Sequence, residues 1–489
     1  MLAFDNSYAR LPERFYARVA PTKVRDPRVL RINRPLAALL GVNPDELASS
    51  AGASVLVGNE LPPGAEPIAL AYAGHQFGGF VPQLGDGRAI LLGEIVGTDG
   101  KRRDIQLKGS GRTPFSRGGD GRAALGPVLR EYLVSEAMAA LGIPTTRALA
   151  VATTGEVVRR DEPLPGAVLT RVAASHLRVG TFEFFAARGD RDAVAALTAH
   201  ALARHYPTAA GSGNDALALL EQVIEAQANL VARWLGVGFV HGVMNTDNTA
   251  ISGETLDYGP CAFIDAYDPN QKFSSIDHGG RYAFSNQPRI AQWNMARLAE
   301  ALLDLLADDP DEAIRLATDR LSRFSALFDA AHLRVLRAKL GLTREDPDDG
   351  PLALDLLSRL AQNHVDYTLF FRRLCACAAG PSFDADVLPL FENPDGFRTW
   401  AETWRRRLGS DPLSPAARAD AMKRVNPAFI PRNHRVEEAL EAAVRRDDLG
   451  PFDALADVLS RPYDDHPERA DLAAPPGPEW RGYRTFCGT

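Results

Sequence analysis

The spacing of apolar residues changes along this chain, from a strand-like period of two to a helical period. Residues 89–96 predict a strand, residues 97–100 a hairpin turn and residues 103–108 its partner strand, with Ile105 and Leu107 on one face. These three segments therefore predict a β-hairpin.

A helix and more strands follow the hairpin. Helical spacing over residues 125–141, with Pro127 near the start and Gly142 at the end, predicts a helix. Residues 147–158 and 166–172 predict two further strands, the first of them interrupted by a turn at residues 153–155.

Beyond residue 176 the pattern is mostly helical. Residues 216–235 predict a long amphipathic helix that ends at Gly236. Further helices are predicted at 290–306, 312–327 and 352–377, separated by acidic, Pro-containing breaks at 308–311 and 344–350. The first 60 residues are only weakly periodic.

This order of elements predicts an α+β protein with two lobes. Residues 1–175 would form an N-terminal extension and a small β-rich lobe, and residues 176–465 a larger helical lobe. Residues 466–489, which are rich in Pro and contain Cys487, are expected to lie on the surface as a tail.

Composition excludes several classes of protein. Hydrophobic residues are 45% and charged residues 24% of the 489 residues, as in soluble globular proteins. The net charge of -7 argues against a general nucleic-acid binder. No apolar run is long enough to span a membrane, and the N-terminus lacks the pattern of a secretory signal.

The four cysteines do not form a disulfide framework, which fits a reducing cytoplasm. Cys261, Cys375 and Cys377 lie in apolar segments and are expected to be buried. Cys487 lies near the end of the chain, where an accessible thiol is expected.

The densest group of chemically useful side chains follows the long predicted helix. Asn245, Asp247, Asn248 and Asp257 place two Asp and two Asn within thirteen residues. Oxygen ligands at this density suit Mg²⁺ held together with a nucleotide phosphate, as in kinase-like folds. His241 is expected to orient this loop through hydrogen bonds.

Basic residues upstream could meet the nucleotide. Lys108 ends a strand and is followed 23 residues later by Glu131 on a helix, an arrangement in which kinase-like folds place a phosphate-binding lysine and its glutamate. An exposed lysine and a surface glutamate are the alternative. The Gly- and Arg-rich residues 109–122 suit phosphate or, alternatively, a flexible linker. Arg171 and Arg178 flank the expected junction of the lobes, where surface positions are the alternative.

Several of these segments resemble the selenoprotein O family, also called YdiU or SelO. The similar segments are long and ungapped, and they are residues 72–80, 83–89, 106–122, 241–248, 257–260 and 265–269. The resemblance implies a protein-kinase-like fold that binds ATP reversed relative to a kinase. It further implies transfer of AMP to Ser, Thr or Tyr hydroxyls of proteins, with release of pyrophosphate.

The resemblance also implies a role for each matching residue. Asp247 would be the general base, and Asn248 and Asp257 would hold Mg²⁺, with Mn²⁺ as an alternative because both accept octahedral oxygen ligands. Asp257 would also contact ATP, and Glu131 would pair with Lys108. The other implied ATP-binding residues are Gly85, Gly87, Arg88, Lys108, Asp120, Gly121, Arg171 and Arg178.

Two departures keep other readings open. Some family members pair the C-terminal Cys with a loop cysteine, but residues 268–277 contain none here, so Cys487 is left for a mixed disulfide with another protein. Asp247 and Asn248 are adjacent, whereas a kinase separates its base and its Asn by five residues. A kinase-type phosphotransferase and a non-catalytic nucleotide-binding scaffold therefore remain as alternatives.

Overall fold

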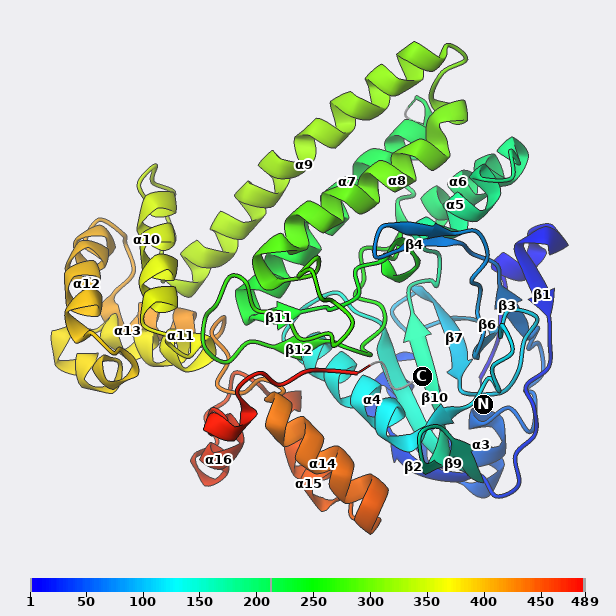
Figure 1. The fold of residues 1–489 in the computed structure, drawn as a ribbon, viewed down its shortest axis with the longest axis horizontal. Coiled ribbons are helices and arrows are strands. Elements are labelled where there is room, and N and C mark those ends of the chain that lie inside the picture. The colour runs from blue at the N-terminus through cyan, green and yellow to red at the C-terminus, as the bar shows by residue number, and fades with distance from the viewer. Residues whose placement is uncertain (1, 212, 487–489) are drawn as a thin grey trace.

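The computed structural model describes residues 2–211 and 213–486, and its largest sheet is antiparallel throughout (Figure 1). The strand order is β1-β3-β6-β7-β10-β9-β2, and β8 pairs with β10. The bounds are β1 Tyr16–Arg18, β2 Arg28–Ile32, β3 Ile68–Leu70, β6 Ala89–Val96, β7 Arg102–Lys108, β8 Ala123–Ala124, β9 Arg147–Arg159 and β10 Pro163–Ala173. The protein thus combines a main antiparallel sheet with many helices, as an α+β class requires.

The predicted hairpin is confirmed as β6 and β7, but the predicted turn within the next strand is wrong. Strand β9 continues through residues 153–155. Thr153 pairs with Ala167 and Val157 with Pro165, so β9 carries extra residues there and forms a bulge. Gly155 has a φ of 67°, which explains why the sequence resembles a turn.

Helix α4, Leu125–Ala140, connects the sheet to the C-terminal part of the chain. One side packs on β9 and β10, and the other contacts α14 (Asn433–Arg446) and α15 (Gly450–Ser460) (Figure 1). Leu129 and Leu133 share a core with Val151, Leu169 and Phe452. The helix is therefore held from both sides, which fixes the position of its polar side chains.

The weakly periodic first 60 residues contribute to the sheet rather than lying outside it. They supply β1 and β2 and the short helices α1 (Arg34–Leu39), α2 (Pro44–Leu47) and α3 (Ser50–Leu56). Leu36 and Leu56 pack against Leu92, Leu107 and Val168 of the sheet. These elements are too short to give a clear hydrophobic period.

Long helices make up most of the chain after residue 176. Helices α7, α8 and α9 pack against one another, and α5 and α6 lie beside them (Figure 1). Their bounds are α5 Val179–Ala186, α6 Arg191–His205, α7 Asp215–Val237, α8 Gln287–Leu306 and α9 Pro310–Lys339. Helix α9 extends well past the predicted end at residue 327, because no Gly or Pro interrupts it before Gly341.

The predicted helix at 352–377 is wrong, because two helices occupy this segment. Helix α10, Asp349–Gln362, ends before His364, whose φ is 48°. Asp366 then caps α11, Tyr367–Cys377, by accepting a hydrogen bond from Leu369 N. Helices α12 (Pro394–Leu408) and α13 (Pro415–Lys423) complete this region.

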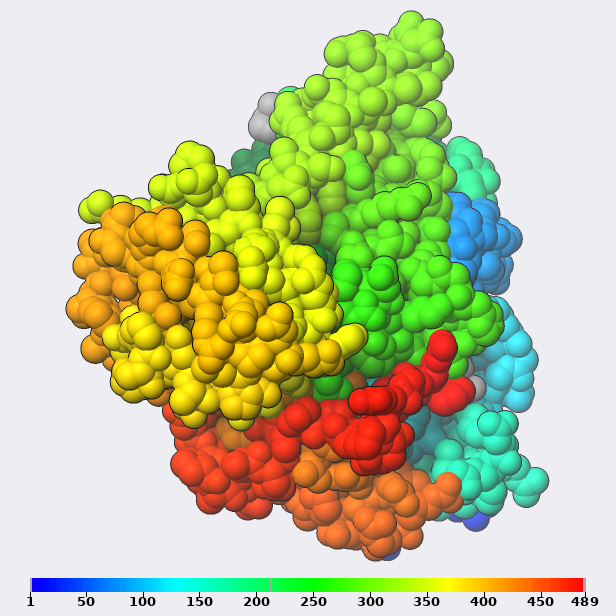
Figure 2. Space-filling view, turned by 60° about the vertical axis from the view of Figure 1, so that its left-hand side comes forward, coloured from blue at the N-terminus to red at the C-terminus, as the bar shows by residue number. Residues whose placement is uncertain are grey.

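The C-terminal segment runs over the surface, with Thr485 buried beneath it. Figure 2 shows it, in red, running between the orange helices α14 and α15 and the green loops that follow α7. After α16 (Ala470–Ala473), Thr485 N donates a hydrogen bond to Phe273 O, and Thr485 Oγ1 donates one of 2.6 Å to Pro260 O. Cys487 lies outside the described residues.

Buried cysteines are confirmed at 261, 375 and 377. Among the described residues, none of the helices combines the length and the apolar character needed to cross a membrane.

Candidate active site

Lys108 and Glu131 form an ion pair between the sheet and helix α4. Lys108 is the last residue of β7, and Glu131 lies on the first half of α4, where packing on both sides buries it. A second carboxylate is close, because Lys108 Nζ lies 3.6 Å from Asp257 Oδ1. The lysine is therefore shared between two acidic side chains.

Two buried arginines extend this charged cluster. Arg171, on β10, lies 3.4 Å from the free oxygen of Glu131. Arg178, just before α5, stacks on the ring of Tyr72 at 4.3 Å and lies 3.5 Å from Asp86. Burying two guanidinium groups is costly unless anions are close, and here Glu131 and Asp86 supply them.

The acidic loop is positioned by the end of α7 and by His241. Gly238 ends the helix with a φ of 77°, and β11 (Phe239–Val240) then pairs with β12 (Ala262–Phe263). His241 Nε2 donates to Leu256 O, while Nδ1 accepts from Val243 N. Burial lowers the pKa of His241, so a neutral imidazole ties the Asp247 segment to the Asp257 segment.

Asp247 lies in a short 3₁₀ helix, Thr246–Asn248, and its carboxylate is buried. Gln76 Nε2 donates to Oδ2 at 3.2 Å, while Oδ1 has no hydrogen-bond partner among the described residues. Burial raises the pKa of Asp247 to about 6, with Arg178 opposing the shift and Asp257 adding to it. A carboxylate with a free oxygen and such a pKa can accept a proton near neutral pH.

Asp257 has the opposite electrostatic setting. Burial alone would raise its pKa, but the charges of Lys108, Arg88 and Arg171 together lower it below its usual range. Its φ of 71° is uncommon for a residue other than Gly and is best tolerated by Asp and Asn. Asp257 is therefore held as a carboxylate in a conformation that few other residues accept.

Asn248 and Asp257 carry amide and carboxylate oxygens, which are the atom types that a hard divalent cation binds. Asn248 Nδ2 donates to Val243 O at 3.1 Å, which turns its Oδ1 away from that contact. The described residues contain no cluster of three or more His, Cys, Asp or Glu able to bind a metal. Mg²⁺ often binds proteins through only one or two carboxylates and completes its octahedron with phosphates and water.

Gly85, Gly87 and Arg88 form the turn that enters β6. Gly85 has a φ of 71°, and a Cβ atom there would lie 2.3 Å from the ring of Phe115. Thr113 Oγ1 donates to Asp86 O at 2.6 Å, and Ser116 Oγ donates to Gly87 O. The segment 109–122 is therefore an ordered cover over this turn rather than a free linker.

Asp120 and Gly121 lie at the base of that cover, apart from the charged cluster. Arg160 donates to both oxygens of Asp120, at 2.8 and 3.1 Å, and this pairing lowers the pKa of Asp120. A Cβ atom at Gly121 would lie 2.1 Å from the backbone of Gly111. Asp120 therefore pairs with Arg160, and Gly121 packs on Gly111. Neither residue has a contact with Lys108 or Asp257 among the described residues.

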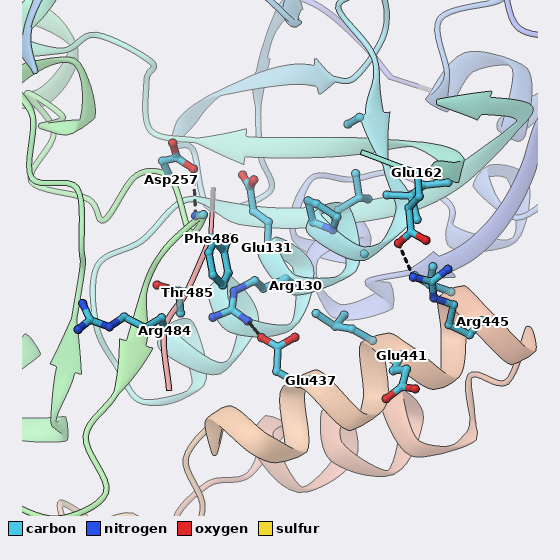
Figure 3. Close-up of a pocket in the computed structure, with 18 of the residues that line it drawn as sticks. Arg130, Glu131, Glu162, Asp257, Glu437, Glu441, Arg445, Arg484, Thr485 and Phe486 are labelled. Carbon is cyan, nitrogen blue, oxygen red and sulfur yellow. Dashed lines mark hydrogen bonds and ion pairs between the residues drawn. The ribbon is translucent and has the colours of Figure 1, made fainter. Parts of the chain in front are cut away.

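A cavity of about 650 Å³ opens beside the cluster (Figure 3). Arg88, Lys108, Glu131 and Asp257 line one end, and an apolar stretch includes Val128, Leu164, Leu440 and Val444. Figure 3 shows Thr485 and Phe486 of the tail near Asp257 and Glu131, with the Glu162–Arg445 ion pair at the far side. The inner end of the cavity thus carries two cations and two carboxylates, and further out apolar side chains alternate with charged ones such as Glu441 and Arg445.

Sequence reasoning assigned no role to several residues that the fold brings to the cluster. Asp86 is buried, faces Arg178 and accepts from Gln106 Nε2 at 3.2 Å. Tyr282, which is also buried, donates from Oη to Oδ1 of Asn245 at 2.6 Å. Tyr72 and Gln76 lie within residues 72–80, which resemble the selenoprotein O family. That resemblance was the feature of the sequence that could have identified them as site residues.

Comparison with known proteins covers the whole chain. The family model described as "Protein adenylyltransferase SelO" matches residues 1–460. The chain is 63% identical over 495 residues to "Protein nucleotidyltransferase YdiU" of Methylorubrum populi (strain ATCC BAA-705 / NCIMB 13946 / BJ001), covering 100% of this chain and 99% of the relative. It is 62% identical over 486 residues to the protein of that name from Bradyrhizobium sp. (strain ORS 278), covering 99% of each.

Proposed function

The chain belongs to the SelO family of protein adenylyltransferases, and we propose that it transfers AMP from ATP to Ser, Thr and Tyr hydroxyls of proteins. As a nucleotidyltransferase it uses a nucleotide as substrate. Oxygen of the acceptor hydroxyl would form a bond to the α-phosphorus, and the bond from that phosphorus to the β-phosphate oxygen would break. Pyrophosphate would leave, and the hydroxyl proton would pass to a base.

The observation that carries this proposal is the group of four cations gathered around Asp257 and Asp247. Lys108, Arg88 and Arg171 all act on Asp257, and Arg178 lies against Asp247. These four cations lie among four carboxylates, because Glu131 pairs with Lys108 and Arg171 and Asp86 faces Arg178. Their N–H groups are the donors that a polyphosphate binds. We therefore assign these cations to the phosphates of ATP.

Asp247 is the proposed general base. Its pKa of about 6 keeps it ionised at neutral pH yet basic enough to take a proton. Its Oδ1 has no hydrogen-bond partner among the described residues, and Arg178 Nη1 fixes the backbone by donating to Asp247 O at 2.8 Å. We assign Asn248 and Asp257 to Mg²⁺ or Mn²⁺, which would offset phosphate charge when bound.

Within this proposal, the remaining residues position these groups. Glu131 would hold Lys108 in place, as the glutamate of a kinase-like fold does. Gly85 and Gly87 would bring backbone near the nucleotide, and Asp120, which pairs with Arg160, and Gly121 would lie towards its purine-ribose end. We further propose the two-lobed arrangement of a protein kinase, with the lobes meeting near residue 175 and the site between them.

The acceptors would be proteins met in the cytoplasm, which four cysteines without a disulfide framework favour. We also propose that Cys487 can form a mixed disulfide with another protein.

Nucleotide labelling tests the proposed reaction directly. The protein would be incubated with Mg²⁺ and a protein mixture, and with ATP labelled on either the α- or the γ-phosphate. AMP transfer puts the α-label on protein and releases pyrophosphate, and mass spectrometry then finds AMP on a hydroxyl side chain. A γ-label on protein would instead show a kinase-type phosphotransferase. ATP binding without either label on protein would show a non-catalytic scaffold.

A further inference from the structure

An exposed surface of aromatic and basic residues lies next to Asp247 and outside the cavity described above. It consists of Phe77 and Phe80 on a small hairpin, β4 (Gly74–Gln76) and β5 (Gly79–Val81), together with Arg281, Arg289 and Trp293. We call these five residues the acceptor surface. A hollow of about 640 Å³ is lined by Arg281, Arg289 and Trp293.

The hairpin connects this surface to the proposed base. His75 N donates to Thr246 Oγ1 at 2.7 Å, and Phe77 N donates to Asn245 Oδ1 at 3.1 Å. Gln76, between them, donates to Asp247 Oδ2. Three consecutive residues of the hairpin are therefore attached to three consecutive residues of the acidic loop.

Gln76 indicates the side from which an acceptor would approach. The Gln76 amide donates a hydrogen bond to the Asp247 carboxylate, as the hydroxyl of an acceptor would. A hydroxyl that replaced Gln76 as the donor to Oδ2 would come from the hairpin side, because Gly74 packs against Oδ1. The side chains next to that path are Phe77 and Phe80, which are 36% and 41% exposed despite being apolar.

The rest of the surface is a set of aromatic rings and guanidinium groups in contact with one another. The Phe77 ring lies 5.1 Å from Tyr282, and the His75 ring lies 4.9 Å from Phe80 and 5.3 Å from Trp293. Arg281 stacks on Trp293 at 4.7 Å. Packing therefore joins the hairpin to the start of α8 in one continuous face.

The charge of this face is unusual for the chain. The protein has a net charge of -7, yet Arg281 and Arg289 have no carboxylate within ion-pair distance among the described residues. Arg297, which also stacks on Trp293, is paired with Glu300 at 2.6 Å. Two unpaired guanidinium groups beside exposed phenyl rings favour an acidic partner that also carries an apolar side chain.

We propose that the acceptor surface binds the acidic segment of the substrate protein that carries the modified hydroxyl. Carboxylates of that segment contact Arg281 and Arg289, and a neighbouring apolar side chain contacts Phe77 or Phe80. This inference rests on the proposed AMP transfer and adds the chemistry of the preferred acceptor to it.

Peptides test the inference with ATP and a fixed concentration of free Mg²⁺. Each peptide carries a single Thr or Tyr and one Leu, flanked either by Asp or by Lys. We expect kcat/KM for AMP transfer to be at least about tenfold higher for the acidic peptide, because several opposite charges meet. Arg281→Glu combined with Arg289→Glu should reverse this preference in favour of the Lys peptide.

A reversed preference cannot come from a damaged fold, since a misfolded enzyme loses both peptides. Arg289→Glu alone, at an exposed position, should reduce the preference without disturbing the stacked groups. Arg406→Glu makes the same charge change on the exposed side of α12 and should leave the preference as it is.

Three results would overturn the inference. They are equal rates for both peptides, an unchanged preference in the Arg281 and Arg289 variants, and AMP found on the enzyme itself but on neither peptide. Failure of the proposed function looks different, because no AMP would then be found on the enzyme or on any peptide.

Discussion

Gly74 packs directly against the carboxylate of Asp247. A Cβ atom at position 74 would lie 2.5 Å from Asp247 Oδ1, the oxygen without a hydrogen-bond partner among the described residues. The hairpin thus shapes the space around the proposed base, although the two residues are far apart in sequence.

Gly74→Ala should therefore reduce AMP transfer sharply, by about 10²-fold or more, because even a small displacement of a positioned catalytic group is costly. Steady-state kinetics on the variant give the measurement. Gly79→Ala is the matched control on the same hairpin, since its Cβ would approach nothing closer than 3.5 Å. Equal activity of both variants and the wild type would contradict the assignment of Asp247.

Asp247→Asn should lower turnover by about 10²–10⁴-fold, while the affinity for ATP changes little. Because Asp247 has a pKa of about 6 and must be ionised to act, the wild-type rate should rise with pH through about 6 and then level off. The residual rate of the variant should lack this rise. Full recovery of the rate at high Mg²⁺ would instead make Asp247 a residue that only orients Asn248.

The same substitution should stabilise the fold at neutral pH. Burial raises the pKa of Asp247 from 3.8 to about 6, so the ionised side chain disfavours the folded state. This penalty is absent below pH about 4, develops between about 4 and 6 and is complete above about 6. Asp247→Asn should raise the free energy of unfolding by about 2 kcal/mol at pH 7. Urea unfolding of both proteins at pH 4 and pH 7 measures the difference.

Asp257→Asn should abolish transfer and weaken metal-dependent ATP binding, because it removes the charge of a proposed metal ligand. Asn tolerates the φ of 71°, so this variant avoids the backbone strain that Asp257→Ala would add. Calorimetric titration with ATP, with and without Mg²⁺, should show that the variant has lost the enhancement by metal. A wild-type enhancement in the variant would rule out Asp257 as a ligand.

Lys108→Met should abolish transfer and also destabilise the fold, by about 2 kcal/mol, because it leaves Glu131 with Arg171 as its remaining cation. This differs from the behaviour of a surface lysine, since the Lys108 side chain is only 12% exposed. Adding Glu131→Gln should restore stability but not activity. Thermal unfolding and AMP transfer, measured on both variants, separate the structural effect from the catalytic one.

The hydrophobic period was sufficient to predict the elements that carry much of the site. Strands β6 and β7 and helix α4 lie where the sequence predicts them, because their local pattern and flanking Gly and Pro residues agree with their packing. The position of Lys108 at a strand end and of Glu131 on the following helix was therefore available from sequence alone.

Local pattern failed where a single backbone conformation decided the structure. Strand β9 stays continuous through the bulge at Gly155, because β10 and β2 pair with β9 on its two sides. The left-handed conformation of His364 divides one helical pattern into two helices. Neither effect changes the spacing of apolar residues, so neither could be read from it.

Residue types and their grouping came from the sequence, whereas their charges and contacts came from the tertiary structure. The sequence alone places Asp247 and Asp257 on one loop and identifies the surrounding cations as candidates. Only folding brings Gln76 to Asp247 and Asp86 to Arg178, across long separations in the chain. Burial then raises the pKa of one Asp, while Lys108, Arg88 and Arg171 lower that of the other. Desolvation and charge proximity depend on three-dimensional packing, and for that reason two identical residues ten positions apart acquire opposite properties.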